Sequence, residues 1–173
     1  MPAPMSPTGL ANTRAALECC WFLGRRLAEV QRQLSGTLPT SPERLHGLNA
    51  AEEQHIEAFL YRLGSAFTTF IEEAVPIVLM AEEDVWVPIR LTHDLRDLEY
   101  CAAIPAADEV LEMNERVGEH YLIATLAPEP RTEALNAAWA DGEALIGILV
   151  WLSQHLQERD LVPGLPPFEP GPP

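Results

Sequence analysis

The sequence has few basic residues. It carries 11 Lys and Arg against 26 Asp and Glu, which gives a formal net charge of −15 at pH 7. An acidic surface repels phosphate backbones, so this charge disfavours general nucleic-acid binding, and we expect no DNA partner. The charge suits a soluble protein, or one whose partner is basic.

Cysteine is also scarce. Cys19, Cys20 and Cys101 are an odd number and form no CxxC pair. This usage fits a reducing compartment and argues against a disulfide framework. We interpret the adjacent Cys19 and Cys20 as two small buried residues on a helix, in preference to a redox or metal-binding thiol pair.

No signal peptide and no membrane-spanning run is evident. The N-terminal residues have neither a basic region nor an apolar stretch. The longest apolar run, residues 144–152, is far shorter than the roughly 18 residues of a membrane helix. We therefore expect a cytoplasmic protein with no membrane partner. Its predicted organisation is a flexible arm (1–7), a single helical bundle domain (8–158) and a proline-rich tail (159–173) that is disordered or polyproline-like.

Alternating strand patterns are missing, whereas apolar residues recur three or four positions apart along most of the chain. That spacing is typical of amphipathic helices. It predicts helices over residues 8–34, 50–80, 85–102, 106–126 and 131–156. The helices are long and most connections short, which favours antiparallel neighbours. We expect an all-α fold, an antiparallel up-and-down helical bundle of four to five helices, with the second and fourth helices as its central pair.

Several residues mark the helix boundaries. Ser41 predicts a short turn inside the loop at 36–50, and Asn49 with Glu52 makes a capping-box pattern at the start of the second helix. Pro76 predicts a kink or an end there.

The apolar stripes also predict which side chains point inward. In the third helix these are Trp86, Ile89, Leu95 and Leu98, and in the fourth Val110, Met113, Val117 and Tyr121.

Common catalytic signatures are missing as well. The sequence has no phosphate-binding or dinucleotide-binding loop, no GxSxG elbow and no HExxH. Glu52 and His55 have the Glu-x-x-His spacing of di-iron bundles, but the second copy that those bundles use is missing. We interpret Glu52 and His55 as solvated charges in a first turn. The sequence thus predicts no metal site and no cofactor.

Three other histidines are assigned to exposed positions. His46 lies in the predicted loop, His93 on a solvated helix face, and His155 on the surface of the last helix.

The best candidate site lies near the end of the fourth helix. Arg116 and His120 are four residues apart, so they share a helix face. An arginine that holds a phosphate and a histidine that transfers a proton would suit RNA cleavage, in which charge develops on the phosphate. The alternative is an ordinary polar border of a core helix.

The order of three segments resembles the HEPN superfamily, helical proteins often encoded beside minimal nucleotidyltransferases in toxin–antitoxin pairs. These segments are EAFLYRLGSAF at 57–67, IPAADEV at 104–110, and the stretch from Asn114 to His120 and Tyr121. The likeness covers roughly residues 48–126. It implies a four-helix up-and-down bundle that pairs through its conserved helices. It also implies, for active members, a metal-independent ribonuclease with an Arg followed by four to six residues and a His.

This sequence departs from that motif. The positions with permitted spacing before His120 are Glu115, Asn114 and Met113, and Arg116 is separated from His120 by three residues only. We therefore expect a HEPN-like bundle that acts by protein–protein contact, as a homodimer or with a nucleotidyltransferase-like protein.

Two alternatives stay open. The first is a ribonuclease that uses His120, Arg116 and Asn114 and binds RNA only in that case. The second is a metal-binding bundle built on Glu52 and His55.

Overall fold

The protein is all-helical. The computed structural model describes residues 7–82 and 90–171. Helix makes up 78% of the structure and no strand occurs among the described residues, which confirms the all-α prediction. That part of the chain contains seven α-helices, more than the four to five expected. The elements follow in this order: α1 (Pro7–Leu34), α2 (Pro42–Leu45), α3 (Ala50–Thr69), η1 (Phe70–Ala74), α4 (Val75–Glu82), α5 (Leu91–Tyr100), α6 (Ala107–Gly118), η2 (His120–Thr125) and α7 (Pro128–Glu158).

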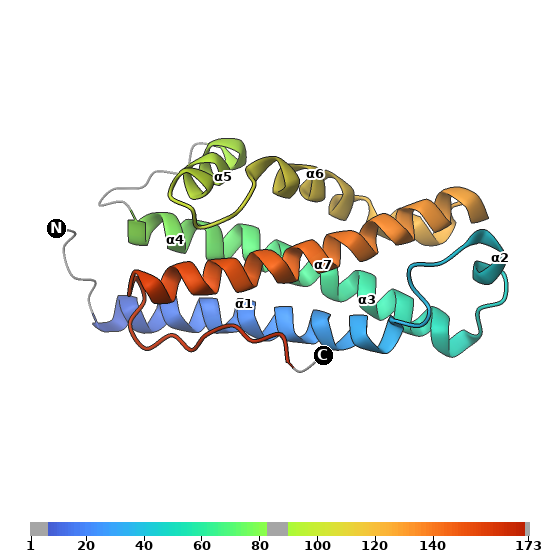
Figure 1. Cartoon of the computed structure of the whole chain (residues 1–173), viewed down its shortest axis with the longest axis horizontal. Coiled ribbons are helices and arrows are strands. Elements are labelled where there is room, and N and C mark those ends of the chain that lie inside the picture. Colours follow the sequence, from blue (N-terminus) through green and yellow to red (C-terminus); the bar gives the residue numbers. More distant parts are fainter. Residues whose placement is uncertain (1–6, 83–89, 172–173) are drawn as a thin grey trace.

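Three long rods form the body of the molecule. Helix α1, the continuous α3–η1–α4 rod and helix α7 lie side by side, while the short helices α5 and α6 pack on the side away from α1 (Figure 1). The predicted central pair is therefore wrong. Helix α1 has 28 residues and packs along α3 and α7, whereas α6 has only 12 residues and lies at the outside.

One hydrophobic cluster joins the helices. Its largest fully buried side chains include Trp21 of α1, Phe59 of α3 and Phe70 of η1. Burial of each such side chain stabilises the fold by about 1.5–3 kcal/mol. Leu95 and Leu98 of α5 belong to this cluster as predicted, whereas Trp86 and Ile89 lie outside the described residues.

The helix starts predicted at Asn49 and Ser41 are confirmed, whereas the third helix, predicted from residue 85, begins at Leu91 after an extended Arg90. The Asn49 side chain accepts hydrogen bonds from the backbone N–H groups of Ala51 and Glu52, and the Glu52 carboxylate accepts one from the Asn49 N–H at 2.9 Å. Ser41 likewise accepts a hydrogen bond from the Arg44 N–H and caps α2. These contacts satisfy donors that a helix start leaves free.

Pro76 does not end the second helix. Proline has no N–H, and its ring would clash with the carbonyl four residues earlier. The helix instead widens into the π turn η1, where the Val75 N–H donates to the Phe70 carbonyl five residues back. Helix α4 then continues to Glu82.

The predicted fourth helix is divided into two parts. Helix α6 ends at Gly118, and the 3₁₀ helix η2 follows. Val110 and Met113 are buried as predicted, but Tyr121 is 77% exposed. A 3₁₀ helix has three residues per turn, so its side chains leave the stripe set by the preceding α-helix. Ile123 points into the core in place of Tyr121.

The proline-rich tail is packed, so the prediction of disorder is wrong. The indole N–H of Trp21 donates to the Pro166 carbonyl at 3.1 Å, and the Phe168 N–H donates to the Ser153 hydroxyl at 2.7 Å. The rings of Trp21 and Phe168 lie 5.6 Å apart. Because Leu165 and Phe168 bury apolar surface on the bundle, they anchor a segment whose proline content alone suggests disorder.

The predicted burial of the two adjacent cysteines is right for Cys20 and wrong for Cys19. Cys20 is buried in the core, and burial raises the pKa of its thiol to about 12. Cys19, one position away on α1, is exposed.

Two helical segments are long and apolar enough to span a membrane, judged by length and composition only. They are Ala50–Glu82 and Pro128–Glu158, with mean hydropathies of 1.4 and 1.2. Half of the most apolar window of each is buried inside the bundle.

Candidate functional site

The end of α6 carries the predicted site residues, and the structure brings two of the three together. Arg116 of α6 and His120 of η2 both line a pocket of about 220 Å³ that α7 closes with Ala134, Ala137 and Ala138. Asn114 is exposed and lines neither this pocket nor the larger one beside it. Arg116 lies in the last turn of α6 and His120 begins η2, so the α-helical spacing expected between them is interrupted after Gly118.

Arg116 is held by carboxylates. Its Nη2 lies 2.6 Å from Oδ1 of Asp141 and its Nε lies 3.0 Å from Oδ2, a bidentate pair. Its Nη1 also lies 3.6 Å from the Glu112 carboxylate. The hydrogen bond to Asp141 is the main cause that raises the pKa of Arg116. Its positive charge is thus already neutralised inside the protein.

Asp141 itself was not predicted as part of the site. It is 4% exposed and lies in the middle of α7, between the buried Ala138 and Leu145. A carboxylate on an apolar stripe is rarely buried without a partner. The sequence therefore indicates that Asp141 has a partner, but it does not identify Arg116 as that partner.

His120 combines a partly buried ring with a ring nitrogen that lacks a hydrogen-bond partner in the described part of the chain. Its Nδ1 is buried and has no hydrogen-bond partner among the residues that the structure describes. Burial lowers the pKa of its imidazole, the Asp141 charge raises it, and the Arg116 charge lowers it, in decreasing order of effect. The net result is a lowered pKa, which favours the neutral ring that can accept a proton.

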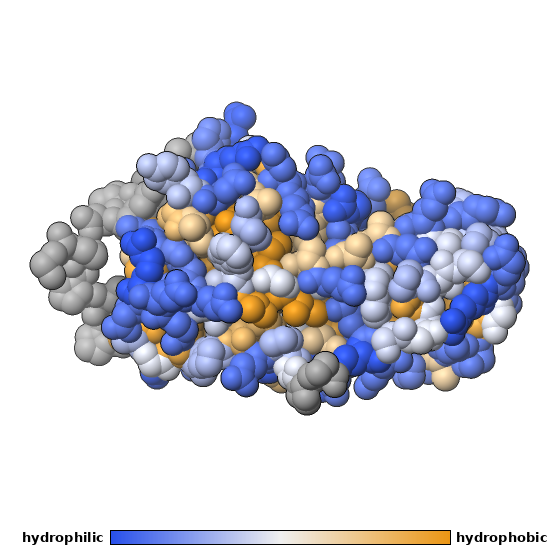
Figure 2. Space-filling model, viewed as in Figure 1, coloured by the Kyte–Doolittle hydropathy of each residue, from blue (hydrophilic) through white to orange (hydrophobic). Residues whose placement is uncertain are grey.

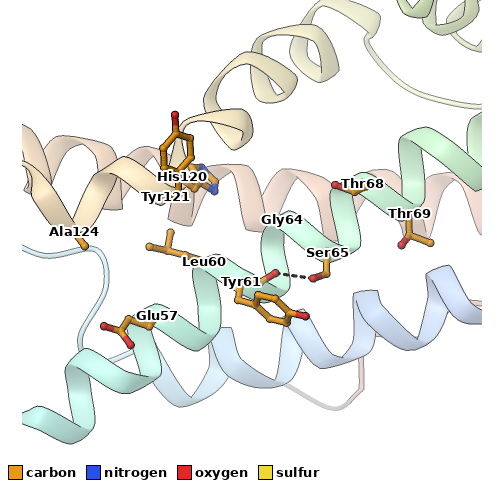
Figure 3. Close-up of a pocket in the computed structure, with 10 residues that line it drawn as sticks. All are labelled: Glu57, Leu60, Tyr61, Gly64, Ser65, Thr68, Thr69, His120, Tyr121 and Ala124. Atoms are coloured by element: carbon orange, nitrogen blue, oxygen red, sulfur yellow. Dashed lines mark hydrogen bonds between the residues drawn. The ribbon is translucent and has the colours of Figure 1, made fainter.

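A second, larger cleft lies on the other side of His120. It has a volume of about 710 Å³ and separates α3 from η2. Figure 3 shows His120 and Tyr121 on one side and the α3 residues Leu60, Tyr61 and Gly64 on the other. Ser65 also lines the cleft, but its hydroxyl donates to the Tyr61 carbonyl at 2.9 Å.

Two exposed aromatic side chains line this cleft. Tyr61 and Tyr121 are each 77% exposed, whereas the exposed Leu122 and Leu126 line the smaller pocket that His120 shares. Glu57 is the one acidic side chain that lines the cleft. The cleft is therefore a nearly uncharged surface on a strongly acidic protein.

Glu52 and His55 of the Glu-x-x-His pair lie near the start of α3. The Glu52 carboxylate serves the capping box, and His55 is exposed. Within residues 7–82 and 90–171, neither belongs to a group of three ligand-type side chains. Among the other histidines, His93 is exposed as predicted, and His46 contacts the Pro42 carbonyl through its Nδ1 at 2.7 Å.

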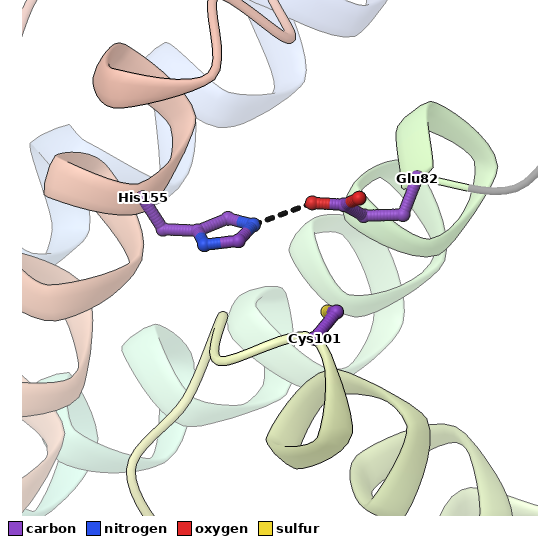
Figure 4. Close-up of side chains that lie close together, drawn as sticks. All are labelled: Glu82, Cys101 and His155. Carbon is purple, nitrogen blue, oxygen red and sulfur yellow. Dashed lines mark hydrogen bonds and ion pairs between the residues drawn. The ribbon is translucent and has the colours of Figure 1, made fainter.

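The surface assignment of His155 is wrong. His155 is 8% exposed, and its Nε2 lies 2.5 Å from Oε1 of Glu82. Cys101 lies beside this pair (Figure 4). These residues come from α7, α4 and the end of α5, so their proximity depends on how three helices pack and has no signature in local sequence spacing.

No protein-family model, no curated protein and no solved structure matches this chain.

Proposed function

We propose that this chain is a HEPN-like helical bundle that pairs with a second copy of itself through the cleft between α3 and η2, with its catalysis lost. The single observation that carries this proposal is the pair of exposed aromatic side chains that line the cleft from its two sides, Tyr61 of α3 and Tyr121 of η2. Exposed apolar surface of this kind is typical of a protein–protein interface.

Charge supports a second copy as the occupant. The chain carries −15 overall, so two copies repel each other over most of their surfaces. Hydrophilic residues cover most of the face shown in Figure 2, with apolar residues gathered near its centre. The cleft is lined by one carboxylate, Glu57, so two copies that meet there bring few negative charges together. The alternating directions of α1, the α3–η1–α4 rod, the α5–α6 pair and α7 in Figure 1 also support the up-and-down interpretation that the HEPN resemblance implies.

The experiment is sedimentation velocity of the full chain over a range of concentrations. We expect a dimer that Tyr121→Asp converts to a monomer, because a carboxylate would be buried at the interface. Tyr100→Asp is the matched control, since Tyr100 is 95% exposed on α5, away from the cleft. A monomeric wild type, or equal effects of the two substitutions, would contradict the proposal. Capture of a nucleotidyltransferase-like protein that Tyr121→Asp abolishes would replace the second copy as the occupant.

A ribonuclease is the second candidate, favoured by one observation. His120 lines the cleft, and its lowered pKa favours the neutral ring that a general base needs. We place it second because the Arg116 charge, which would bind the phosphate, is matched by Asp141 and Glu112. RNA cleavage by the wild type that His120→Ala abolishes would reverse this order.

A further inference from the structure

Three side chains that can bind a metal meet at the end of the bundle opposite the cap of α3. Glu82 ends α4, Cys101 follows α5, and His155 lies in the last turns of α7. Their ligand atoms all lie within 4.8 Å of one another. We propose that Glu82, Cys101 and His155 bind a divalent transition-metal ion, with Zn²⁺ as the best fit.

The ligand types select the ion. One thiolate, one imidazole and one carboxylate suit Zn²⁺, which takes sulfur, nitrogen and oxygen ligands in tetrahedral sites. Mg²⁺ and Ca²⁺ prefer oxygen ligands throughout, so the thiol and the imidazole argue against them.

Zinc binding requires the nitrogen and oxygen to separate and the sulfur, which lies within 4.8 Å of both, to approach them by up to about 1.5 Å. Tetrahedral zinc with bonds of about 2.0–2.3 Å places adjacent ligand atoms roughly 3.3–3.5 Å apart. The His155 Nε2 and Glu82 Oε1 atoms, now 2.5 Å apart, would separate by under about 1 Å. Side-chain rotation of this size leaves the helices in place.

The backbone fixes Cys101 relative to His155. After α5 the chain closes a Schellman turn, in which the Ala103 N–H donates to the Leu98 carbonyl and the Ala102 N–H donates to the Glu99 carbonyl. Ala102 adopts φ 62°, a left-handed conformation that costs a non-glycine residue energy.

A hydrogen bond ties this turn to α7. The indole N–H of Trp151 donates to the Ala102 carbonyl at 2.8 Å. Trp151 lies one helical turn before His155, so the same helix positions both the turn that carries Cys101 and the imidazole.

A second layer of contacts orients the carboxylate. Arg159 binds the other Glu82 oxygen, with Nη2 2.9 Å from Oε2, which leaves Oε1 facing His155. Contacts of this kind hold metal ligands in position. A pocket of about 260 Å³ lined by Ala102, Trp151, Gln154, His155 and Glu158 adjoins the trio, which gives a fourth ligand, such as water, access to the ion.

The two anionic ligands neutralise the ion when the thiol loses its proton, and Arg159 on the second Glu82 oxygen adds one positive charge beside the site. Burial raises the pKa of the Cys101 thiol, so the metal-free residue is a neutral S–H. On binding, the S–H proton passes to solvent and a sulfur–zinc bond forms. The thiolate and the Glu82 carboxylate together then carry −2 against the +2 ion, and His155 binds as the neutral ring.

The test uses the full, untagged chain and Co²⁺ as a spectroscopic probe for Zn²⁺. We expect one equivalent of Co²⁺ to give a sulfur-to-cobalt charge-transfer band and tetrahedral visible bands, and excess Zn²⁺ to remove both. Cys101→Ser should abolish the charge-transfer band and weaken Zn²⁺ binding by more than about a hundredfold, since loss of a residue that only supports a ligand already costs 10- to 100-fold. Cys19→Ser is the matched control, because Cys19 is an exposed thiol on α1.

Two further measurements separate a loss of metal binding from a loss of folding. Cys101→Ser retains a donor for the Leu98 carbonyl, which the thiol contacts at 3.3 Å, and circular dichroism would confirm its helix content. Glu82→Gln should weaken Zn²⁺ binding and leave the charge-transfer band at saturating Co²⁺. A wild type that shows no saturable binding, or one whose band survives in Cys101→Ser, overturns the proposal and leaves His155 and Glu82 as an ion pair only.

Discussion

Arg116 and Asp141 form a bidentate ion pair in which the carboxylate is buried and the guanidinium is not. The side chain of Arg116 is 41% exposed and that of Asp141 is 5% exposed. The pair joins α6 to the middle of α7, and it satisfies a charge that the apolar core could not otherwise hold.

Loss of the arginine should therefore be costly. Arg116→Met leaves the Asp141 carboxylate buried without its partner, and we expect a loss of about 2–4 kcal/mol in the free energy of unfolding, measured in urea. Arg26→Met is the control, because the Arg26–Glu29 pair lies on the surface and its loss should cost under about 1 kcal/mol. The double variant Arg116→Met/Asp141→Asn should recover part of the loss. Equal losses in the free energy of unfolding for Arg116→Met and Arg26→Met would show that the ion pair with Arg116 does not stabilise the buried Asp141 carboxylate.

The pKa of His120 should lie below the ordinary value of 6.5, measured by NMR titration of the ring. Burial is the main cause, and Asp141→Asn should lower the pKa further because the Asp141 charge raises it. A group with a lowered folded pKa binds its proton more readily when unfolded, so stability falls as the pH drops below about 6.5. His120→Gln should remove that part of the slope. A His120 pKa above 6.5 would contradict the buried position.

The tail should contribute to stability. Phe168→Ala removes a buried ring packed on Trp21, and we expect a loss of about 2–4 kcal/mol together with a change in tryptophan fluorescence. Phe22→Ala is the matched control, since Phe22 is 54% exposed and neighbours Trp21 in sequence. Phe22→Ala should lower the free energy of unfolding by only about 0.5 kcal/mol. An unchanged melting temperature in Phe168→Ala would mean that the tail does not pack in solution.

Two helical glycines should respond to alanine with opposite signs. A Cβ at Gly24 would lie 2.6 Å from the Leu149 Cδ1 and 3.0 Å from the Phe168 ring, so Gly24→Ala should destabilise by about 1–3 kcal/mol. A Cβ at Gly64 would meet nothing within 4 Å, so Gly64→Ala should stabilise by about 0.5–1 kcal/mol through helix propensity. Thermal unfolding of both variants checks this contrast. The same sign at both positions would contradict the packing of α1 on α7.

Much of the fold is predictable from local patterns in the sequence. The spacing of apolar residues identifies the long helices, and Asn49 with Glu52 identifies a helix start, because both patterns act within a few residues. The change from α-helix to 3₁₀ helix after Gly118 has no such local pattern. The apolar stripe therefore wrongly predicts an inward-facing Tyr121.

The site is less predictable, because it depends on contacts between distant segments. Arg116 and His120 are recognisable as a pair, but Asp141 is 25 residues from Arg116 and changes what the arginine can do. His155 and Glu82 are 73 residues apart, so a helix pattern places His155 on the surface when packing buries it. Chemistry that several helices share becomes visible only once the helices are assembled.

The π turn η1 also has a consequence for how this chain tolerates insertions and deletions. A π turn holds one residue more than the α-helix around it, so each residue after it is rotated by about 100° relative to an uninterrupted helix. Deletion of one residue from Phe70–Ala74 would restore regular winding and rotate α4 by that angle. Glu82 would then face away from His155, and Pro76 would lose the widened turn that accommodates its ring. The one extra residue in η1 thus sets the rotation of α4 about its own axis. That rotation decides which side chains meet at the far end of the bundle.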